Sequence, residues 1–122
     1  LSFISLTSVM DDVASFLRSG ASFVSLIKPQ FEADKSLIEP GGVVRDTEVH
    51  TSCIRSVFES AYSSGFEVLA LTYSPVKGPA GNIEFLFWAK NHGTASQQEG
   101  SMCFDEIERV VAAAHARLKG DS

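Results

Sequence analysis

The stretch that decides the fold reads Ile83-Glu84-Phe85-Leu86-Phe87-Trp88. It is an apolar run of strand-forming residues with one carboxylate in it. A carboxylate is costly to bury unless a partner compensates for its lost hydration. A second strand-like run, Phe23-Val24-Ser25-Leu26-Ile27, ends in Lys28-Pro29 and offers that partner. We therefore expect a scaffold that brings Lys28 and Glu84 together at one edge of a sheet.

Length and composition indicate one small globular domain with a real core, because the 122 residues are 44% hydrophobic and 20% charged. A net charge of −5 argues against RNA binding through a general basic surface, but not against an RNA held mainly by another domain. No apolar run approaches a membrane span, and the first residues carry no basic leader. The two cysteines favour a reduced, cytoplasmic protein, and cysteine and histidine spacing predicts no metal site.

Hydrophobic periodicity predicts strands over residues 2–6, 22–28, 66–73 and 83–90, and helices over 47–64 and 103–119. A further helix would be capped by Thr7 or Ser8 and ended by Gly20. The near-continuous apolar run at 22–28 predicts a strand covered on both faces. Residues 29–46 are expected to be irregular, with room for a short helical turn at 32–38, before Asp46 caps the next helix.

The Gly- and Pro-rich loop at 74–82 predicts an antiparallel hairpin, and the polar stretch 91–101 a linker. Because the chain opens directly in a strand-like run, we expect it to be part of a longer one. An open sheet edge at residues 2–6 would then invite pairing with a second copy, so a homodimer or aggregation is expected.

Alternating strands and helices followed by a hairpin predict an α/β fold, with a mostly parallel sheet and one antiparallel strand. Ligands of such sheets lie beyond the carboxyl ends of the parallel strands. Lys28 is expected at that end of its strand, and Glu84 as the second residue of the antiparallel strand that starts there. Periodicity does not show whether these two strands are neighbours.

Three motifs in order carry a family resemblance: Lys28-Pro29-Gln30-Phe31-Glu32-Ala33, Gly41-Gly42-Val43-Val44-Arg45-Asp46, and the run from Ser74 to Leu86. Together they resemble the C-terminal half of the TlyA family, haemolysin-named proteins with an FtsJ-like methyltransferase domain. The opening Ser2-Phe3-Ile4-Ser5-Leu6 and the closing Ala114-His115-Ala116 fit as well. The resemblance covers nearly the whole chain.

The resemblance implies the C-terminal half of a Rossmann-like methyltransferase fold. Residues 1–90 would form that half-domain, 91–101 a linker, and 102–122 a helix packed on the same domain. It also implies an enzyme that uses S-adenosylmethionine to methylate a ribose 2′-hydroxyl of ribosomal RNA. Of the family's Lys-Asp-Lys-Glu tetrad, the second lysine matches Lys28 and the glutamate matches Glu84. The other two members, the glycine-rich cofactor loop and the RNA-binding S4 domain would lie upstream of Leu1, so the isolated chain is expected to be inactive.

Each candidate residue has a plainer alternative. Lys28 is either catalytic or a solvated strand end, and Glu84 is either its partner or an ordinary ion-pair residue. Arg45 would contact RNA phosphate or pair locally with Asp46 or Glu48.

Further substrate contacts are expected from five residues. They are Lys77, Gly81 and Asn82, which otherwise serve turn chemistry, and Ser2 and Phe3, of which Phe3 would otherwise belong to the core. The histidines His50, His92 and His115 are predicted to be helix-surface or linker residues rather than catalysts.

Two other functions compete with the methyltransferase. A membrane-active haemolysin would fit the family's name, but the sequence has no membrane span and no basic amphipathic helix. A non-catalytic RNA-binding module that kept the fold is the second alternative, and the presence of both Lys28 and Glu84 argues mildly against it.

Overall fold

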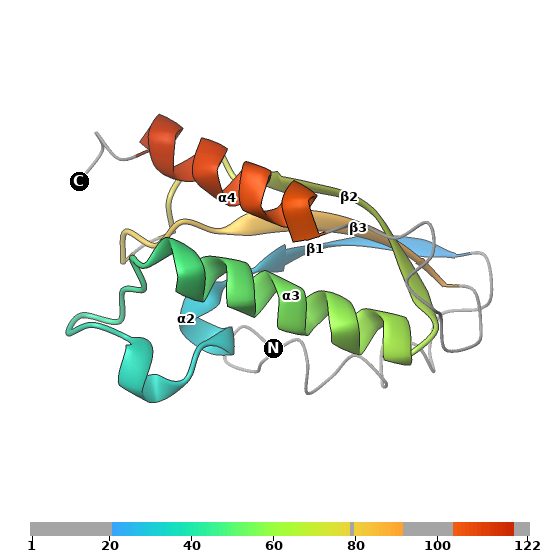
Figure 1. The fold of residues 1–122 in the computed structure, drawn as a ribbon, viewed down its shortest axis with the longest axis horizontal. Coiled ribbons are helices and arrows are strands. Elements are labelled where there is room, and N and C mark those ends of the chain that lie inside the picture. Colours follow the sequence, from blue (N-terminus) through green and yellow to red (C-terminus); the bar gives the residue numbers. More distant parts are fainter. Residues whose placement is uncertain (1–20, 79, 92–103, 119–122) are drawn as a thin grey trace.

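The computed structural model describes residues 21–78, 80–91 and 104–118. Along the chain these form β1 (Ser22–Ile27), α2 (Pro29–Glu32), a 3₁₀ turn (Lys35–Leu37), α3 (Thr47–Ser63), β2 (Phe66–Tyr73), β3 (Phe85–Asn91) and α4 (Phe104–Leu118) (Figure 1). The strand predicted at 2–6, the helix after it and most of the linker at 91–101 lie outside the described residues. The open edge expected at residues 2–6 therefore stays a prediction.

The described strands form one sheet in the order β1-β3-β2. The central strand β3 is antiparallel to both neighbours, so β1 and β2 run in the same direction. The α/β class and the antiparallel β2–β3 hairpin are confirmed. Both ladders among the described strands are antiparallel, so a mostly parallel sheet stays a prediction.

The register of β3 decides which side chains face the core. Ile27 and Tyr73 both lie opposite Phe85, the first residue of the central strand. A register shift between Val68 and Ala70 inserts one extra residue into β2. Val68 and Leu71 are both buried in the hydrophobic core. They are three residues apart, so strict alternation would direct them to opposite faces of the sheet. The bulge brings both to the same face.

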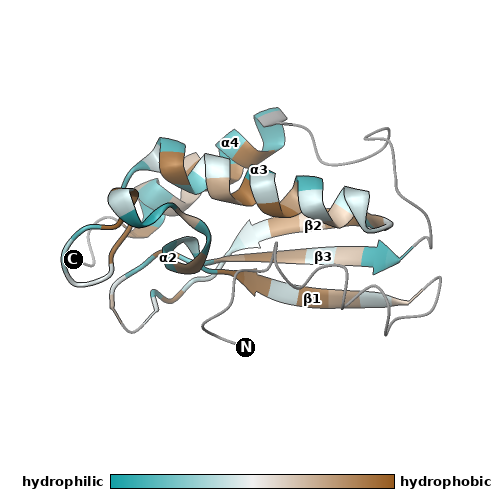
Figure 2. Ribbon diagram, turned by 90° about the horizontal axis from the view of Figure 1, so that it is seen from below, coloured by the Kyte–Doolittle hydropathy of each residue, from teal (hydrophilic) through white to brown (hydrophobic). Residues whose placement is uncertain are grey.

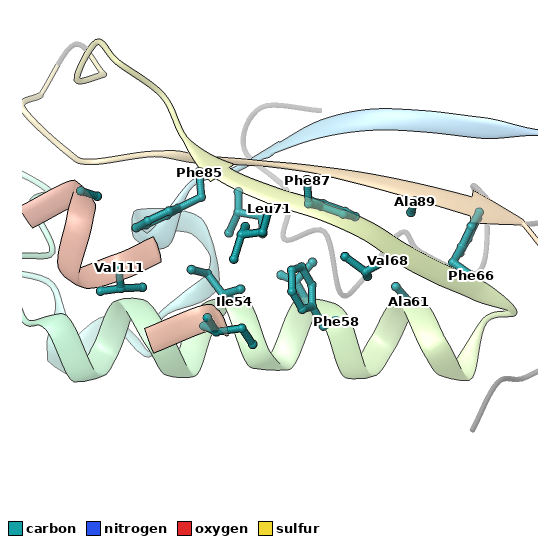
Figure 3. Packing of buried hydrophobic residues seen from close by; sticks show 14 of the residues in the cluster. Ile54, Phe58, Ala61, Phe66, Val68, Leu71, Phe85, Phe87, Ala89 and Val111 are labelled. Carbon is teal, nitrogen blue, oxygen red and sulfur yellow. The ribbon is translucent and has the colours of Figure 1, made fainter. Parts of the chain in front are cut away.

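Both long helices cover the same face of the sheet, as Figure 2 shows. The core between them is apolar, and Figure 3 shows Phe58 of α3 beneath Phe87 of β3 and Val111 of α4 close to Phe85. The two rings of Phe58 and Phe87 have centroids 5.7 Å apart. The core residues are Ile27, Ile54, Val57, Phe58, Ala61, Tyr62, Phe66, Val68, Leu71, Ile83, Phe85, Phe87, Ala89, Ile107, Val111, Ala114 and Leu118.

The opposite face of the sheet is partly exposed. Val24 is 66% exposed and Trp88 is 45% exposed, and these two residues are register partners on β1 and β3. The expectation that the strand at 22–28 is covered on both faces is therefore wrong for the structure described. The apolar run reflects strand propensity, which β-branched and aromatic residues satisfy whether or not the second face is covered.

Helix boundaries follow local chemistry. Asp46 caps α3 as predicted, because its Oδ1 accepts the Glu48 N–H at 2.8 Å. Gly65 follows the helix with a φ of 97°, which glycine adopts at little cost. The segment 29–46 is less irregular than expected, since α2 begins at Pro29, whose fixed φ suits a first helical position.

Neighbouring residues of β3 provide a test of the one-sided core. Phe87 is buried against the helices, whereas Trp88 points to the open face. We expect Phe87→Ala to lower the free energy of unfolding by about 3–5 kcal/mol, since it leaves a cavity. Trp88→Ala should cost less than about 1.5 kcal/mol, because much of its surface is already in water. Urea unfolding of both variants measures this; equal losses would contradict a one-sided core.

Candidate functional site

The sheet register, extended by one step beyond its last pair, brings Lys28 level with Glu84. The last β1–β3 pair is Ile27 with Phe85, and one further step along both strands reaches these two residues. Residues directly opposite in an antiparallel pair have Cβ atoms about 5 Å apart on the same side of the sheet. Glu84 immediately precedes β3 rather than being its second residue, and Lys28 immediately follows β1 as the N-cap residue of α2.

Glu84 is buried and keeps one hydrogen-bonding oxygen unused. The residue is 6% exposed, and its Oε2 has no hydrogen-bond partner among the described residues. Its backbone carbonyl accepts the Ser74 N–H at 2.8 Å, which continues the β2–β3 ladder by one step. The Lys28 ammonium lies 5.7 Å from the centroid of the Phe31 ring, within range of a cation–π contact. The described residues show no ion pair between Lys28 and Glu84, so the buried Oε2 has room for a donor that the structure does not supply.

Gly78 forms one wall around the Glu84 carboxylate. A Cβ added at position 78 would lie 2.3 Å from Glu84 Oε2 and 3.0 Å from its carboxyl carbon. No side chain larger than hydrogen fits there unless the carboxylate moves. The sequence predicted substrate contacts or turn chemistry for this loop, and the close approach to Glu84 is a separate reason for glycine at position 78.

Asn82 joins the loop before Glu84 to the loop before α3. Its Oδ1 accepts the Val44 N–H at 2.8 Å, and its Nδ2 donates to the Gly42 carbonyl at 2.8 Å. The residue is buried, and no described residue other than glycine has a positive φ. Asn82 therefore acts here through its side chain rather than through turn geometry, while Gly81, with a φ of 93°, serves the turn.

The remaining predicted substrate contacts are dispersed. Arg45 is exposed and pairs with Glu39, its Nε lying 3.2 Å from Glu39 Oε1, rather than with either expected acidic neighbour. Lys77 lies half-buried in the β2–β3 loop, and its charge contributes to lowering the pKa of His115. Ser2 and Phe3 lie outside the described residues.

Two histidines are placed differently from the prediction. His50 is fully buried and His115 half-buried, so neither is a simple helix-surface residue. Their rings meet, with His50 Nδ1 2.8 Å from His115 Nε2, while His50 Nε2 lies 2.8 Å from the Val44 carbonyl oxygen. The signal was present in the sequence, because His50 shares the helical face of Cys53 and Ile54. His92 lies outside the described residues.

Burial controls the ionisation of the neighbouring groups. It lowers the pKa of His50 to about 4, against a smaller opposing effect of the hydrogen bond to Val44. Burial likewise lowers the pKa of His115 and raises the pKa of Cys53 to about 11, so this thiol is not a reactive nucleophile.

Other kinds of site find little support in the described part of the chain. A hollow of about 570 Å³ lies between α3 and α4, and one of about 400 Å³ lies beside α2 and α3, both away from Lys28 and Glu84. Residues 21–78, 80–91 and 104–118 contain no group of three or more potential metal ligands. No helix in these ranges is long and apolar enough to cross a membrane.

Comparison with known proteins identifies the protein family of this chain. The model of the FtsJ-like methyltransferase family matches residues 1–91, so the chain belongs to this family. This confirms the resemblance inferred from the three motifs. Glu84 and its Gly78 wall lie within the matched range, whereas α4 lies beyond it.

Three similar proteins carry names that refer to rRNA methylation or to haemolysis. A Bacillus subtilis (strain 168) protein, YqxC, whose name proposes rRNA methylation, is 37% identical over 98% of this chain and 42% of its own length. The 16S/23S rRNA (cytidine-2′-O)-methyltransferase TlyA of Mycobacterium tuberculosis (strain ATCC 25618 / H37Rv) is 37% identical over 74% of this chain and 34% of its own. Hemolysin A of Brachyspira hyodysenteriae is 36% identical over 70% of this chain and 36% of its own.

Solved structures share the fold. A hemolysin-named protein of Streptococcus thermophilus superposes with a TM-score of 0.89 and 36% identity, over 99% of this chain and 42% of that one. One from Lactococcus lactis gives 0.81 and 37% identity, over 93% of this chain and 52% of that one. The chain thus spans between a third and about half the length of the relatives it matches.

Two glycines of one loop test the packing around Glu84. Gly78→Ala should displace the Glu84 carboxylate, because the new Cβ would overlap Oε2. Gly81→Ala meets no atom within 4 Å but has a φ of 93°, so it should cost about 1 kcal/mol of stability and leave the carboxylate in place. Carboxyl ¹³C shifts and urea unfolding measure the two effects. A Glu84 signal unchanged by Gly78→Ala would contradict the close contact.

Proposed function

We propose that this chain forms the C-terminal part of a ribosomal RNA ribose 2′-O-methyltransferase, in which Lys28 and Glu84 are catalytic. The observation that carries the proposal is a buried carboxylate with an unused oxygen at the end of the sheet where β1 runs into Lys28, one register step beyond the Ile27–Phe85 pair. Membership of the FtsJ-like methyltransferase family supports the reaction class. The similarity to the M. tuberculosis 16S/23S rRNA (cytidine-2′-O)-methyltransferase supports rRNA as the substrate and a ribose 2′-hydroxyl as the methyl acceptor.

The position of the pair suits a substrate-binding edge. β1 and β2 end, and β3 begins, at the same end of the sheet, next to α2 (Figure 2). In a Rossmann-like domain completed by further parallel strands, this is the edge where ligands bind. The proposal includes that completed sheet, with residues 1–91 as its C-terminal half.

Each residue has a definite chemical task in the proposal. A ribose hydroxyl is a poor nucleophile while it holds its proton, and an ammonium at hydrogen-bond distance orients it and stabilises the developing negative charge. Lys28 supplies that ammonium. Glu84 uses its free Oε2 to hold the ammonium and to keep it charged when substrate excludes water. Much of the rate then comes from positioning the hydroxyl in line with the methyl donor.

The methyl donor in this proposal is S-adenosylmethionine, whose sulfonium supplies an activated methyl group. The unused oxygen of Glu84 fits an ammonium or hydroxyl donor, so the described residues suit the substrate side of the reaction. We assign none of them to the cofactor. The proposed partner is ribosomal RNA or a ribosomal subunit, and Arg45 and Lys77 are proposed to contact its phosphates.

The proposal is tested by methyl transfer from labelled S-adenosylmethionine to ribosomal RNA, with the full protein that carries this chain. Lys28→Met and Glu84→Gln should each lower kcat at least about 100-fold, since each removes charge that acts in the transition state. Lys90→Met provides the matched control. Lys90 pairs with Ser22 at the opposite end of the same ladder and should retain near-normal activity.

The outcomes separate the hypotheses. Label on a 2′-hydroxyl that depends on Lys28 and Glu84 but not on Lys90 supports both the activity and the site. Equal activity of all variants would refute the site assignment and leave the activity. A wild-type protein that binds ribosomal RNA but transfers no methyl group would favour the non-catalytic binding module.

A further inference from the structure

Helix α4 lies outside the family match, yet a polar contact ties it to the rest of the domain. The match ends at residue 91, and α4 begins at Phe104. Besides its apolar core residues, α4 supplies His115, whose Nε2 lies 2.8 Å from Nδ1 of the buried His50 on α3. Apolar packing alone would hold the helix, so this histidine pair calls for its own explanation.

The hydrogen bond to Val44 determines which histidine of the pair donates and which accepts. His50 Nε2 lies 2.8 Å from the Val44 carbonyl oxygen, and a carbonyl can only accept, so this nitrogen carries the proton. In a neutral ring Nδ1 is then an acceptor. His115 Nε2 must therefore donate to it. The network assigns both tautomers: His115 donates to His50, and His50 donates to Val44.

The same chain of contacts continues to Glu84. The Val44 N–H donates to Asn82 Oδ1 at 2.8 Å, and the Asn82 carbonyl accepts the Gly78 N–H at 2.8 Å. Gly78 in turn forms the close wall of the Glu84 carboxylate. Four hydrogen bonds thus lead from α4 to the residue beside the candidate catalytic carboxylate.

We propose that His115 and His50 are positioning residues, which hold the Gly78 wall in place against Glu84 through Val44 and Asn82. The effect on catalysis rests on the proposed function. The structural link from His115 to the Gly78 wall does not. It gives α4 a task in the methyl-transfer reaction beyond completing the core. The α4 contact should therefore affect turnover more than RNA binding.

The proposed tautomers require neutral rings. Asp46 and Lys77 are the charged groups that act on the pair: Asp46 raises the pKa of both histidines, and Lys77 lowers that of His115. The Phe85 ring packs on His50 from β3 and carries no charge. One added proton is accommodated on His115 Nδ1, because Nε2 of that ring still donates to His50. A second would set N–H against N–H and break the link.

The pH dependence follows from the depressed pKa values. The pKa of His50 is about 4 in the folded protein, and an unfolded histidine titrates at 6.5. The unfolded state therefore binds the additional proton between these values. The stability that the neutral pair contributes is complete above about pH 6.5 and is lost as the pH falls towards 4.

Ring ¹⁵N NMR of the histidine-labelled full protein tests the assignment directly. We expect both His50 and His115 in the Nε2–H tautomer at pH 7.5, with both titrating below pH 6.5. A His50 ring protonated on Nδ1, or one titrating at an ordinary histidine value, would overturn the proposed direction of the chain.

Hydrogen exchange tests the link to Glu84 without any enzyme assay. His115→Phe keeps a ring but removes the donor, and should accelerate exchange of the Val44 and Gly78 amides about fivefold, as expected for weakening one hydrogen bond. His115→Gln retains a donor and should restore part of the protection. Arg117→Gln, a change at an exposed residue of the same helical turn, is the control. Unchanged exchange at both amides in His115→Phe would refute the link.

Kinetics test the catalytic consequence. His115→Phe should lower kcat about tenfold with little change in KM for RNA, because misplacing a catalytic group affects the transition state. His115→Gln should recover part of that loss. If Glu84→Gln abolishes transfer while His115→Phe leaves kcat unchanged, the positioning proposal fails. If Glu84→Gln is itself fully active, the proposed catalytic role of Glu84 fails, and the exchange experiment still decides the structural link.

Discussion

The structure depends most on the pairing of β3, which is hydrogen-bonded to β1 on one side and to β2 on the other. This double pairing ends at the Ile27–Phe85 pair, just before Lys28, on one side, and continues to Ser74, whose N–H bonds the Glu84 carbonyl, on the other. A slip of one residue would turn every side chain of β3 to the other face and remove both the core and the site. Fully buried Phe85 and Phe87 oppose such a slip, because it would expose their rings to water.

Burying the Glu84 carboxylate does not stabilise the folded protein. A carboxylate taken from water loses several kcal/mol of hydration free energy unless its oxygens are paired, and one oxygen here is not. The molecule accommodates it with specific means: a glycine at position 78 and a loop held by Asn82. Local features that oppose stability while the surroundings maintain them are typical of functional sites. The proposed tetrad role is one reason to retain such a carboxylate.

Sequence reasoning singled out Lys28 and Glu84 because each breaks the pattern of a strand-like run, and their catalytic role stays a proposal. The sequence predicted His50 to be a helix-surface residue, and Asn82 to be a substrate contact or a turn residue, because single polar residues at such positions are usually exposed. Their partners, His115 and Val44, come from distant positions, so no local pattern pairs them. Only the histidine's place on an apolar helix face hinted at burial.

The sequence by itself determined the strands and helices of the described part, the Asp46 cap and the hairpin, because these depend on neighbouring residues and on periodicity. The tertiary structure decided that β1 and β3 are neighbours and that the second sheet face is partly open. It also decided that His115 of α4 contacts the buried His50 of α3. These features join residues far apart in the chain, and the packing energy that selects them is shared among many side chains. No single stretch of sequence therefore records them.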